Sequence, residues 1–275
     1  MKLKLFRHLW GVNEPWETAF PKIKAAGYAG IECGLPAPDD EARFRDLLAA
    51  HQFEFIAQIF TAGADVRAHV ASFRSQLARA ATFAPLLINC HGGRDAWTAA
   101  EGQEFYAAVL AIESGTPVLV AHETHRGRIL YNPWITRDLL QLFPDLKLSC
   151  DLSHWVCVSE RLLTSEGDII ALAAERCLHL HARVGYEEGP QVPDPRAAEF
   201  APHLAAHEAW WDMIWASQAA RGMTVTTLSP EFGPPPYQHT LPPAGTPIGN
   251  LAEICDWQAA RQAQRFAARY GASVP

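Results

Sequence analysis

The chain of 275 residues has no run of about 18 consecutive apolar residues, the length that a membrane-spanning helix needs. Its start, MKLKLFRHLW, lacks the apolar core and small-residue cleavage site of a secretory signal peptide. We therefore expect a cytoplasmic protein with no membrane contact. Positive charge is also scarce, because 23 Lys and Arg face 30 Asp and Glu, a formal net charge of −7. The overall basic excess typical of nucleic-acid-binding proteins is thus missing.

Several sequence signatures of other protein classes are absent as well. The six cysteines form no C-x-x-C pair and mostly lie inside apolar runs, so buried free thiols explain them better than disulfides or a zinc knuckle. No G-x-G-x-x-G opens a helix after the first candidate strand, which removes the dinucleotide-binding fingerprint. The chain is, however, rich in histidine, with 12 residues, and their positions need an explanation.

The sequence does contain a regular alternation of two kinds of segment. Segments of helical periodicity, several with Asp, Thr or Asn at the start and Gly or Pro at the end, separate short apolar runs. The alternation predicts a single-domain (β/α)8 TIM barrel over residues 1–275, with an open doubly wound sheet as the alternative. The predicted strands are 3–10, 28–34, 53–60, 85–93, 117–125, 146–154, 177–185 and 224–233.

Two connections are longer than the others. Residues 186–206 follow the seventh predicted strand, and the proline-rich segment 232–249 follows the eighth. In a barrel, both would lie over the mouth at the C-terminal ends of the strands, where active sites are built. They serve either as walls of the site or as a subunit interface, and a homo-oligomer would fit the second role.

Polar side chains gather at the C-terminal ends of the predicted strands. Residues two apart on a strand share a face, and the ends of barrel strands converge on one mouth, so these side chains are expected to meet in one cavity. Glu32, Gln58 and Glu123 end three strands. Other strands end in polar pairs, which are Asn89 and His91, Ser149 and Asp151, His179 and His181, and Ser229 and Glu231.

Ionised groups collected in a partly desolvated cavity need either cationic partners or a metal ion. Fixed positive charge near this rim is limited to Arg94, Arg126, Arg128 and Arg183. We therefore predict one divalent metal ion as cofactor. Mixed carboxylate and imidazole ligands suit Mn²⁺ or Zn²⁺, and also Co²⁺ or Fe²⁺, better than Mg²⁺, which prefers oxygen ligands.

Four motifs in chain order resemble the xylose isomerase-like TIM-barrel superfamily. The resemblance is closest to its sugar phosphate isomerase/epimerase branch, which includes proteins like hydroxypyruvate isomerase and tagatose epimerase. It covers essentially the whole chain. The motifs are H-E-T-H (122–125), C-D-L-S-H-W (150–155), H-L-H-A-R (179–183) and S-P-E-F-G (229–233).

The resemblance implies roles for individual residues of this chain. His154 and Arg183 would contact substrate oxygens. The metal ligands would be Glu123, Asp151, His181 and Glu231.

Other polar and aromatic residues take their expected roles from strand position. His179 lies deeper than His181 on the same face and is expected to support the ligands. His91 and Glu32 either contact substrate or form hydrogen bonds in the interior. His8 and Trp10 end the first strand and either wall the pocket or pack there.

The expected function is a divalent-metal-dependent isomerase or epimerase of a keto- or aldo-sugar, or of another small hydroxy-carbonyl compound. Glu123 and Glu231 would transfer the proton through a metal-stabilised ene-diolate. A dehydratase of a cyclic polyol or keto acid fits the same site, and a non-catalytic ligand-binding barrel is an alternative of another class. An apurinic-site endonuclease-like hydrolase fits less well, because Gln58 stands where that branch has a histidine and its D-x-H is missing. We expect no nucleic-acid partner.

Overall fold

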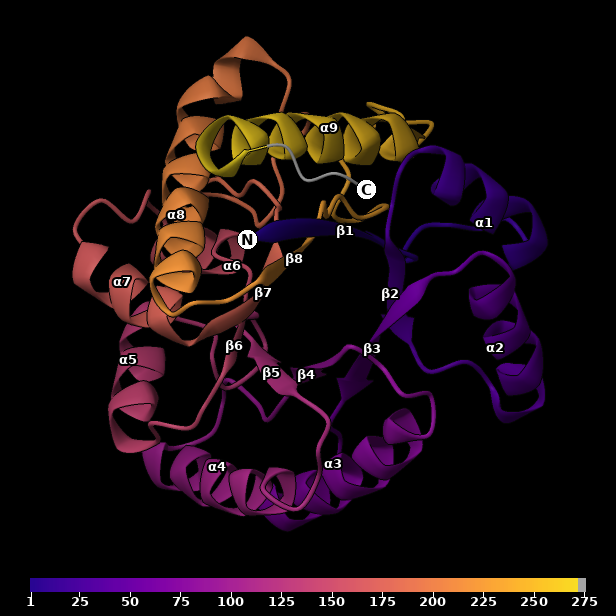
Figure 1. Cartoon of the computed structure of the whole chain (residues 1–275). Helices are drawn as coiled ribbons and strands as arrows, with labels where there is room; N and C mark the ends of the chain where they lie inside the picture. Colours follow the sequence, from indigo (N-terminus) through magenta and orange to yellow (C-terminus); the bar gives the residue numbers. More distant parts are fainter. Residues whose placement is uncertain (272–275) are drawn as a thin grey trace.

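In the computed structural model, which describes residues 1–271, eight parallel strands close into a barrel and helices cover its outside (Figure 1). The strands are β1 (Lys2–His8), β2 (Gly30–Gly34), β3 (Glu54–Phe60), β4 (Leu87–His91), β5 (Val120–Glu123), β6 (Leu148–Cys150), β7 (Cys177–His181) and β8 (Val225–Ser229). The sheet closes where β1 pairs with β8, with Lys2 opposite Val225 and Leu5 opposite Leu228. The predicted (β/α)8 barrel is therefore confirmed, and the open sheet is wrong.

Helices connect successive strands, and the last one, in yellow, lies outside β1 in the ring of helices, between α8 and α1 (Figure 1). They are α1 (Trp16–Ala25), α2 (Glu41–Ala50), α3 (Val66–Ala81), α4 (Ala99–Glu113), α5 (Pro133–Leu142), α6 (Ser153–Ser159), α7 (Gly167–Arg176), α8 (Ala201–Ala220) and α9 (Leu251–Tyr270). Several begin as the sequence predicts. Thr98 forms a capping box with Glu101 at α4, and Asn132 accepts the Ile135 N–H at 2.8 Å at α5.

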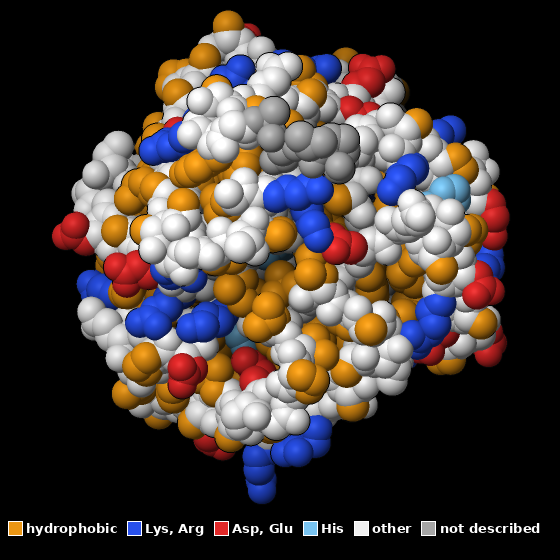
Figure 2. Space-filling view, viewed as in Figure 1, with side chains coloured by type: hydrophobic (Ala, Val, Ile, Leu, Met, Phe, Trp, Pro, Cys, Tyr) orange, Lys and Arg blue, Asp and Glu red, His pale blue; other side chains and the backbone are white. Residues whose placement is uncertain are grey.

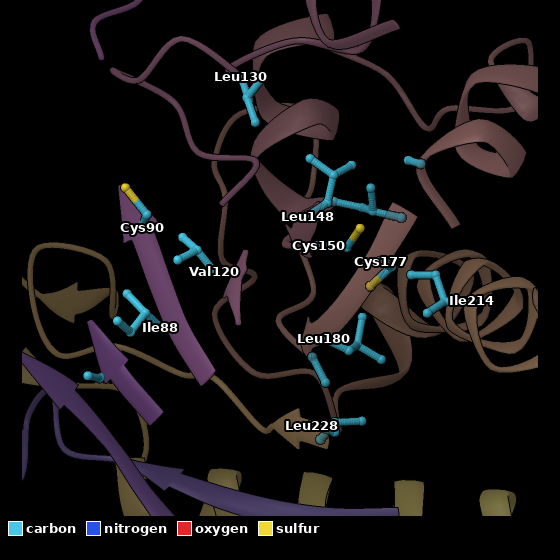
Figure 3. Packing of buried hydrophobic residues seen from close by; sticks show 14 of the residues in the cluster. Ile88, Cys90, Val120, Leu130, Leu148, Cys150, Cys177, Leu180, Ile214 and Leu228 are labelled. Atoms are coloured by element: carbon cyan, nitrogen blue, oxygen red, sulfur yellow. The ribbon is translucent and has the colours of Figure 1, made fainter. Parts of the chain in front are cut away.

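The two faces of each barrel strand have different chemistry. Residues such as Ile88, Cys90, Leu180 and Leu228 are fully buried and pack outward in the core between barrel and helices (Figure 3). The alternate residues point into the barrel, as the period of two along a strand requires. The outer face therefore holds the helices, and the inner face is left for polar side chains.

An apolar layer closes the interior of the barrel beneath the site. It consists of Phe6, Ile56, Leu87 and Ala121, all of them buried. Gly30 is required beside this layer, because a Cβ there would lie 2.4 Å from the ring of Phe6. His8, Gln58, Asn89 and Glu123 lie two residues nearer the C-terminal ends of the same strands, so the layer separates them from the opposite end of the barrel.

The sixth predicted strand is too long at its C-terminal end. It was expected to run to His154, but β6 ends at Cys150 and α6 begins at Ser153. The carboxylate of Asp151 accepts the Ser153 N–H at 3.0 Å, which turns the chain out of the strand and into the helix. His154 consequently lies on a helix, one turn beyond the rim.

The two long connections are joined to each other by hydrogen bonds. Gln191 donates to the Gly233 carbonyl at 3.0 Å and accepts the Gly233 N–H at 2.6 Å. Segment 232–249 contains a short hairpin of β9 (Thr240–Leu241) and β10 (Thr246–Pro247). Whether these connections act as lids or as an interface stays a prediction.

The structure also bears on long apolar helices and on the cysteines. Within residues 1–271, no helix is both long and apolar enough to cross a membrane. The six cysteines all lie in this range and are unpaired. On the face shown in Figure 2, acidic, basic and hydrophobic side chains are interspersed, without a broad area of one charge.

We predict that His207 makes the fold sensitive to acid. This buried residue of α8 donates from Nδ1 to the His203 carbonyl and accepts the Gly185 N–H at Nε2, and burial lowers its pKa to about 4. Because the unfolded chain binds the proton at a pKa of about 6.5, this residue's contribution to the free energy of unfolding, about 3 kcal/mol, should be lost as the pH falls from 6.5 to 4. Urea unfolding of the native protein and the His207→Gln variant measures it. Parallel pH profiles of the two proteins would contradict the prediction.

Candidate metal and active site

The four predicted metal ligands converge at the C-terminal end of the barrel. Glu123 ends β5, Asp151 follows β6, His181 ends β7 and Glu231 lies two residues beyond β8, and none is more than 7% exposed. Potential ligand atoms of Asp151, His181 and Glu231 all lie within 4.8 Å of one another. Glu123 Oε2 lies 3.7 Å from His181 Nδ1. The strand-end positions thus bring the four residues together.

Two of these ligand atoms form a buried ion pair with each other. His181 Nδ1 and Glu231 Oε2 are 2.8 Å apart, but the contact lacks the angles of a hydrogen bond, and neither atom has another hydrogen-bond partner among the described residues. Buried polar atoms without a well-formed hydrogen bond are rare and call for an explanation. A nitrogen and a carboxylate oxygen that both point into one small space fit a divalent cation between them, and the donor set suits a borderline ion such as Zn²⁺ or Mn²⁺.

The other imidazole nitrogen of His181 contacts Glu32. His181 Nε2 lies 2.8 Å from Glu32 Oε1, and His179 Nε2 lies 3.0 Å from Glu32 Oε2. A carboxylate only accepts, so we assign the proton of each ring to Nε2. A bound metal ion would take the place of the proton on His181 Nδ1 and use its lone pair, and His179 Nδ1 accepts from the Thr227 hydroxyl at 2.8 Å. The arrangement is the carboxylate–histidine support common around protein metal sites.

Glu32 is surrounded by protein donors and does not line the pocket. Besides the two histidines, Asn89 Nδ2 donates to it at 3.1 Å, Gln58 Nε2 at 3.2 Å, and the Ser229 hydroxyl also donates. The side chain is fully buried. Of the two roles that the sequence left open for Glu32, these contacts favour the interior one.

Asp151 is held by Arg183 and by the start of α6. Arg183 donates to Asp151 Oδ2 from Nη2 at 2.6 Å and from Nε at 3.1 Å, and its Nη2 lies 3.4 Å from Glu231 Oε1. Burial, with help from Glu231 and Glu123, raises the pKa of Asp151 to about 6 although Arg183 opposes this. Arg183 therefore contacts two of the three carboxylates, while Glu123 lies against His91 and His181. The excess of carboxylates over guanidinium groups suits a divalent ion.

The carboxylates act strongly on His181. Burial alone would lower the pKa of His181, but Glu32, Glu231 and Glu123 outweigh it and hold the pKa well above the ordinary value. Burial would likewise raise the pKa of Glu123, yet His91 and His181 lower it to about 2. The pKa of Glu231 is lowered as well, mainly by Arg183 and His181 against burial. The centre of the site thus attracts positive charge.

A pocket of about 460 Å³ opens onto this cluster. Of the predicted site residues, His91, Glu123, Arg183 and Glu231 line it, as do His8 and Trp10. His154 is fully buried behind the lining, where its Nε2 accepts from Arg183 Nη2 at 2.9 Å. His154 therefore does not line the pocket and can act on a substrate only by positioning Arg183.

Sequence reasoning missed part of the lining. Phe60 stacks on His91 with ring centroids 4.4 Å apart, and Tyr237 lies edge-on to Trp10 at 4.8 Å. Arg128 and His125 complete the wall on the β5 side. The sequence placed His125 only within the H-E-T-H motif, without a role in the site, and it indicated Arg128 only as a nearby cation. Phe60 is the last residue of β3, and the other three lie on the loops after β5 and β8. Nearness to a strand end was the available signal, but the sequence of a loop does not fix the direction of its side chains.

Comparison with known proteins bears on the fold. No protein-family model matches the sequence, and no curated protein matches it either. Three solved structures match over 94% of this chain and 98% of their own. They are the probable 3-DHS dehydratase AsbF from Bacillus anthracis (TM-score 0.63, 15% identity), the 3-keto-D-glucoside 4-epimerase YcjR from E. coli (0.61, 11%) and an AP endonuclease, family 2, from Brucella melitensis (0.58, 15%).

At these identities the similarity establishes the fold and leaves the reaction open, because the three proteins carry the names of a dehydratase, an epimerase and an endonuclease. The protein accordingly shares the (β/α)8 barrel fold of these three proteins.

Proposed function

We propose that the protein is a divalent-metal-dependent isomerase or epimerase of a small hydroxy-carbonyl compound of sugar size. The observation that carries this proposal is the buried cluster of Asp151, His181 and Glu231, in which His181 Nδ1 and Glu231 Oε2 lie 2.8 Å apart and Glu231 lines the pocket. Glu123, Asp151, His181 and Glu231 would hold the ion. When bound, it supplies Lewis acidity to neighbouring carbonyl and hydroxyl oxygens, which acidifies the C–H bond between them.

Glu123 and Glu231 are the proposed proton carriers. Both line the pocket, and they come from β5 and from the end of β8, on two sides of His181. Their lowered pKa values keep both ionised at neutral pH, as a proton acceptor must be. A proton returned to the opposite face of the same carbon gives an epimer, and a proton returned to the neighbouring carbon gives an isomer.

Arg183 is the proposed substrate-orienting group. Its Nε and Nη2 are occupied by Asp151, while its buried Nη1 has no hydrogen-bond partner in the part of the chain that the structure describes. Since Arg183 lines the pocket, Nη1 is available to a substrate oxygen. His154 accepts from Nη2 and so fixes the guanidinium plane. We propose a small acyclic or cyclic sugar-like molecule as substrate, with no nucleic acid as partner.

Metal content tests the site directly. We predict about one Mn, Zn, Co or Fe per native chain by inductively coupled plasma mass spectrometry, and loss of it in the Asp151→Asn variant. Asp168→Asn, on an exposed position of α7, is the matched control and should keep the ion. Circular dichroism checks that both variants fold. Two or three ions per chain would favour the endonuclease-like reaction, and none after incubation with each metal would exclude the proposed site.

The proton-transfer roles predict a specific loss. Glu123→Gln and Glu231→Gln should each lower kcat about 10²- to 10⁴-fold, because a carboxamide cannot carry the proton. The assay follows deuterium entry from D₂O into a panel of keto-sugars, with metal content measured alongside. Glu104→Gln, exposed on α4, should retain full activity. A near-native rate in either active-site variant would refute the two-carboxylate scheme, and a conjugated enone product would identify a dehydratase.

The support of His181 by Glu32 predicts an effect on metal affinity without a direct contact. In the Glu32→Gln variant, the amide can donate as well as accept, so the assigned tautomer of His181 is no longer enforced. We expect metal affinity to fall about 10- to 100-fold. Competition with a fluorescent chelator measures the dissociation constant. An unchanged affinity would mean that Glu32 only packs the interior.

A further inference from the structure

The two arginines that line the pocket differ in their partners. Arg183 is paired with Asp151 and lies beside Glu231. Within the described residues, the side chain of Arg128 makes a single hydrogen bond, from Nη1 to the carbonyl of Thr61 at 3.0 Å. Within residues 1–271, no carboxylate forms an ion pair with Arg128. One cation of the pocket is therefore neutralised by the protein, and the other is not.

The position of Arg128 is fixed by a buried anchor. Thr61 is 1% exposed, its hydroxyl accepts the Gly93 N–H at 3.0 Å, and the same hydroxyl contacts His69 Nδ1 at 2.8 Å. These contacts join the loops after β3 and β4 and hold the carbonyl that receives Arg128 Nη1. The guanidinium is thus oriented in advance, with its remaining N–H groups unused by the protein.

Arg128 is also partly removed from water. Its side chain is half-buried, and burial is the main cause of the lowering of its pKa. A guanidinium stays charged under these conditions, and a charge that has lost hydration without gaining a partner is costly. Glu123 acts on it through space but forms no contact with it, so the cost is only partly relieved. An anionic ligand group would relieve the rest.

We propose that Arg128 binds an oxyanion group of the substrate, either a carboxylate or a phosphate monoester. This inference rests on the proposed function, because it places the hydroxy-carbonyl part of the same molecule against Glu123 and Glu231. Arg128 and these glutamates line one pocket of about 460 Å³, which is a sufficient volume for a sugar acid or a sugar phosphate. The planar fork of arginine matches both oxyanions with two parallel hydrogen bonds. The substrate class is therefore an acidic sugar derivative and not a neutral sugar.

The first test compares three compounds that share a carbon skeleton. Isothermal titration calorimetry of the metal-loaded protein uses D-fructose, D-fructuronate and D-fructose 6-phosphate. We expect at least one anionic compound to bind about 10- to 100-fold more tightly than fructose, as a charge-assisted hydrogen bond provides. Arg128→Met should remove this preference, and Arg94→Met, an exposed neighbour that also acts on His69, should keep it. Whichever anion has the Arg128-dependent preference identifies the oxyanion.

A second measurement does not depend on the carbon skeleton or on turnover. Phenylglyoxal modifies accessible arginines, and peptide mass spectrometry reads each position separately. Inorganic phosphate or malonate should slow modification of Arg128 and leave that of Arg94 unchanged. Absence of protection by both anions, or an anion preference that survives Arg128→Met, would overturn the proposal. Protection without proton exchange in any hydroxy-carbonyl compound would instead keep the oxyanion site and refute the isomerase.

Discussion

Three carboxylates held together away from water are the constraint on which the rest of the site depends. Glu123, Asp151 and Glu231 come from three different strand ends, and the closed barrel gives them no freedom to separate. Like charges in a desolvated space are tolerated only with positive charge among them. Arg183 supplies one such charge. The same carboxylates raise the pKa of His181, which favours a second positive charge on its imidazole ring. The proposed ion, His181 and Arg183 thus all reduce the repulsion among the same three carboxylates.

Much of this site could be predicted from the sequence, because a barrel converts position along the chain into position in space. Residues at the C-terminal end of any barrel strand meet at the mouth, whatever their separation in sequence. Glu123 and His181 end their strands, and Asp151 directly follows β6, so the approximate place of each strand end was enough to predict that they meet. Glu231 lies two residues beyond its strand and still keeps to the inner face. The regular geometry of the barrel strands thus made it possible to predict that these residues meet.

The sequence did not decide what depends on depth within the barrel or on irregular backbone. Glu32 was expected at the end of its strand, as Glu123 is, but it lies in the middle of β2 and one layer lower, where His179, His181 and Asn89 surround it. The depth follows from the stagger of neighbouring strands, which periodicity along one strand does not reveal. Arg128 and Tyr237 lie on loops, so their approach to the pocket depends on anchors such as the Thr61 carbonyl. Only the folded chain shows these contacts.

The hydrogen bonds between Gln191 and Gly233 have a consequence for how this barrel can vary. Gln191 of segment 186–206 and Gly233 of segment 232–249 are hydrogen-bond partners of each other. The two segments therefore do not fold independently at the barrel mouth. A change of length in one connection would leave a buried amide or a backbone group of the other without a partner, at a cost of about 1 to 3 kcal/mol. Insertions at the mouth are therefore expected to occur in both connections together, as matched changes in a single structural unit.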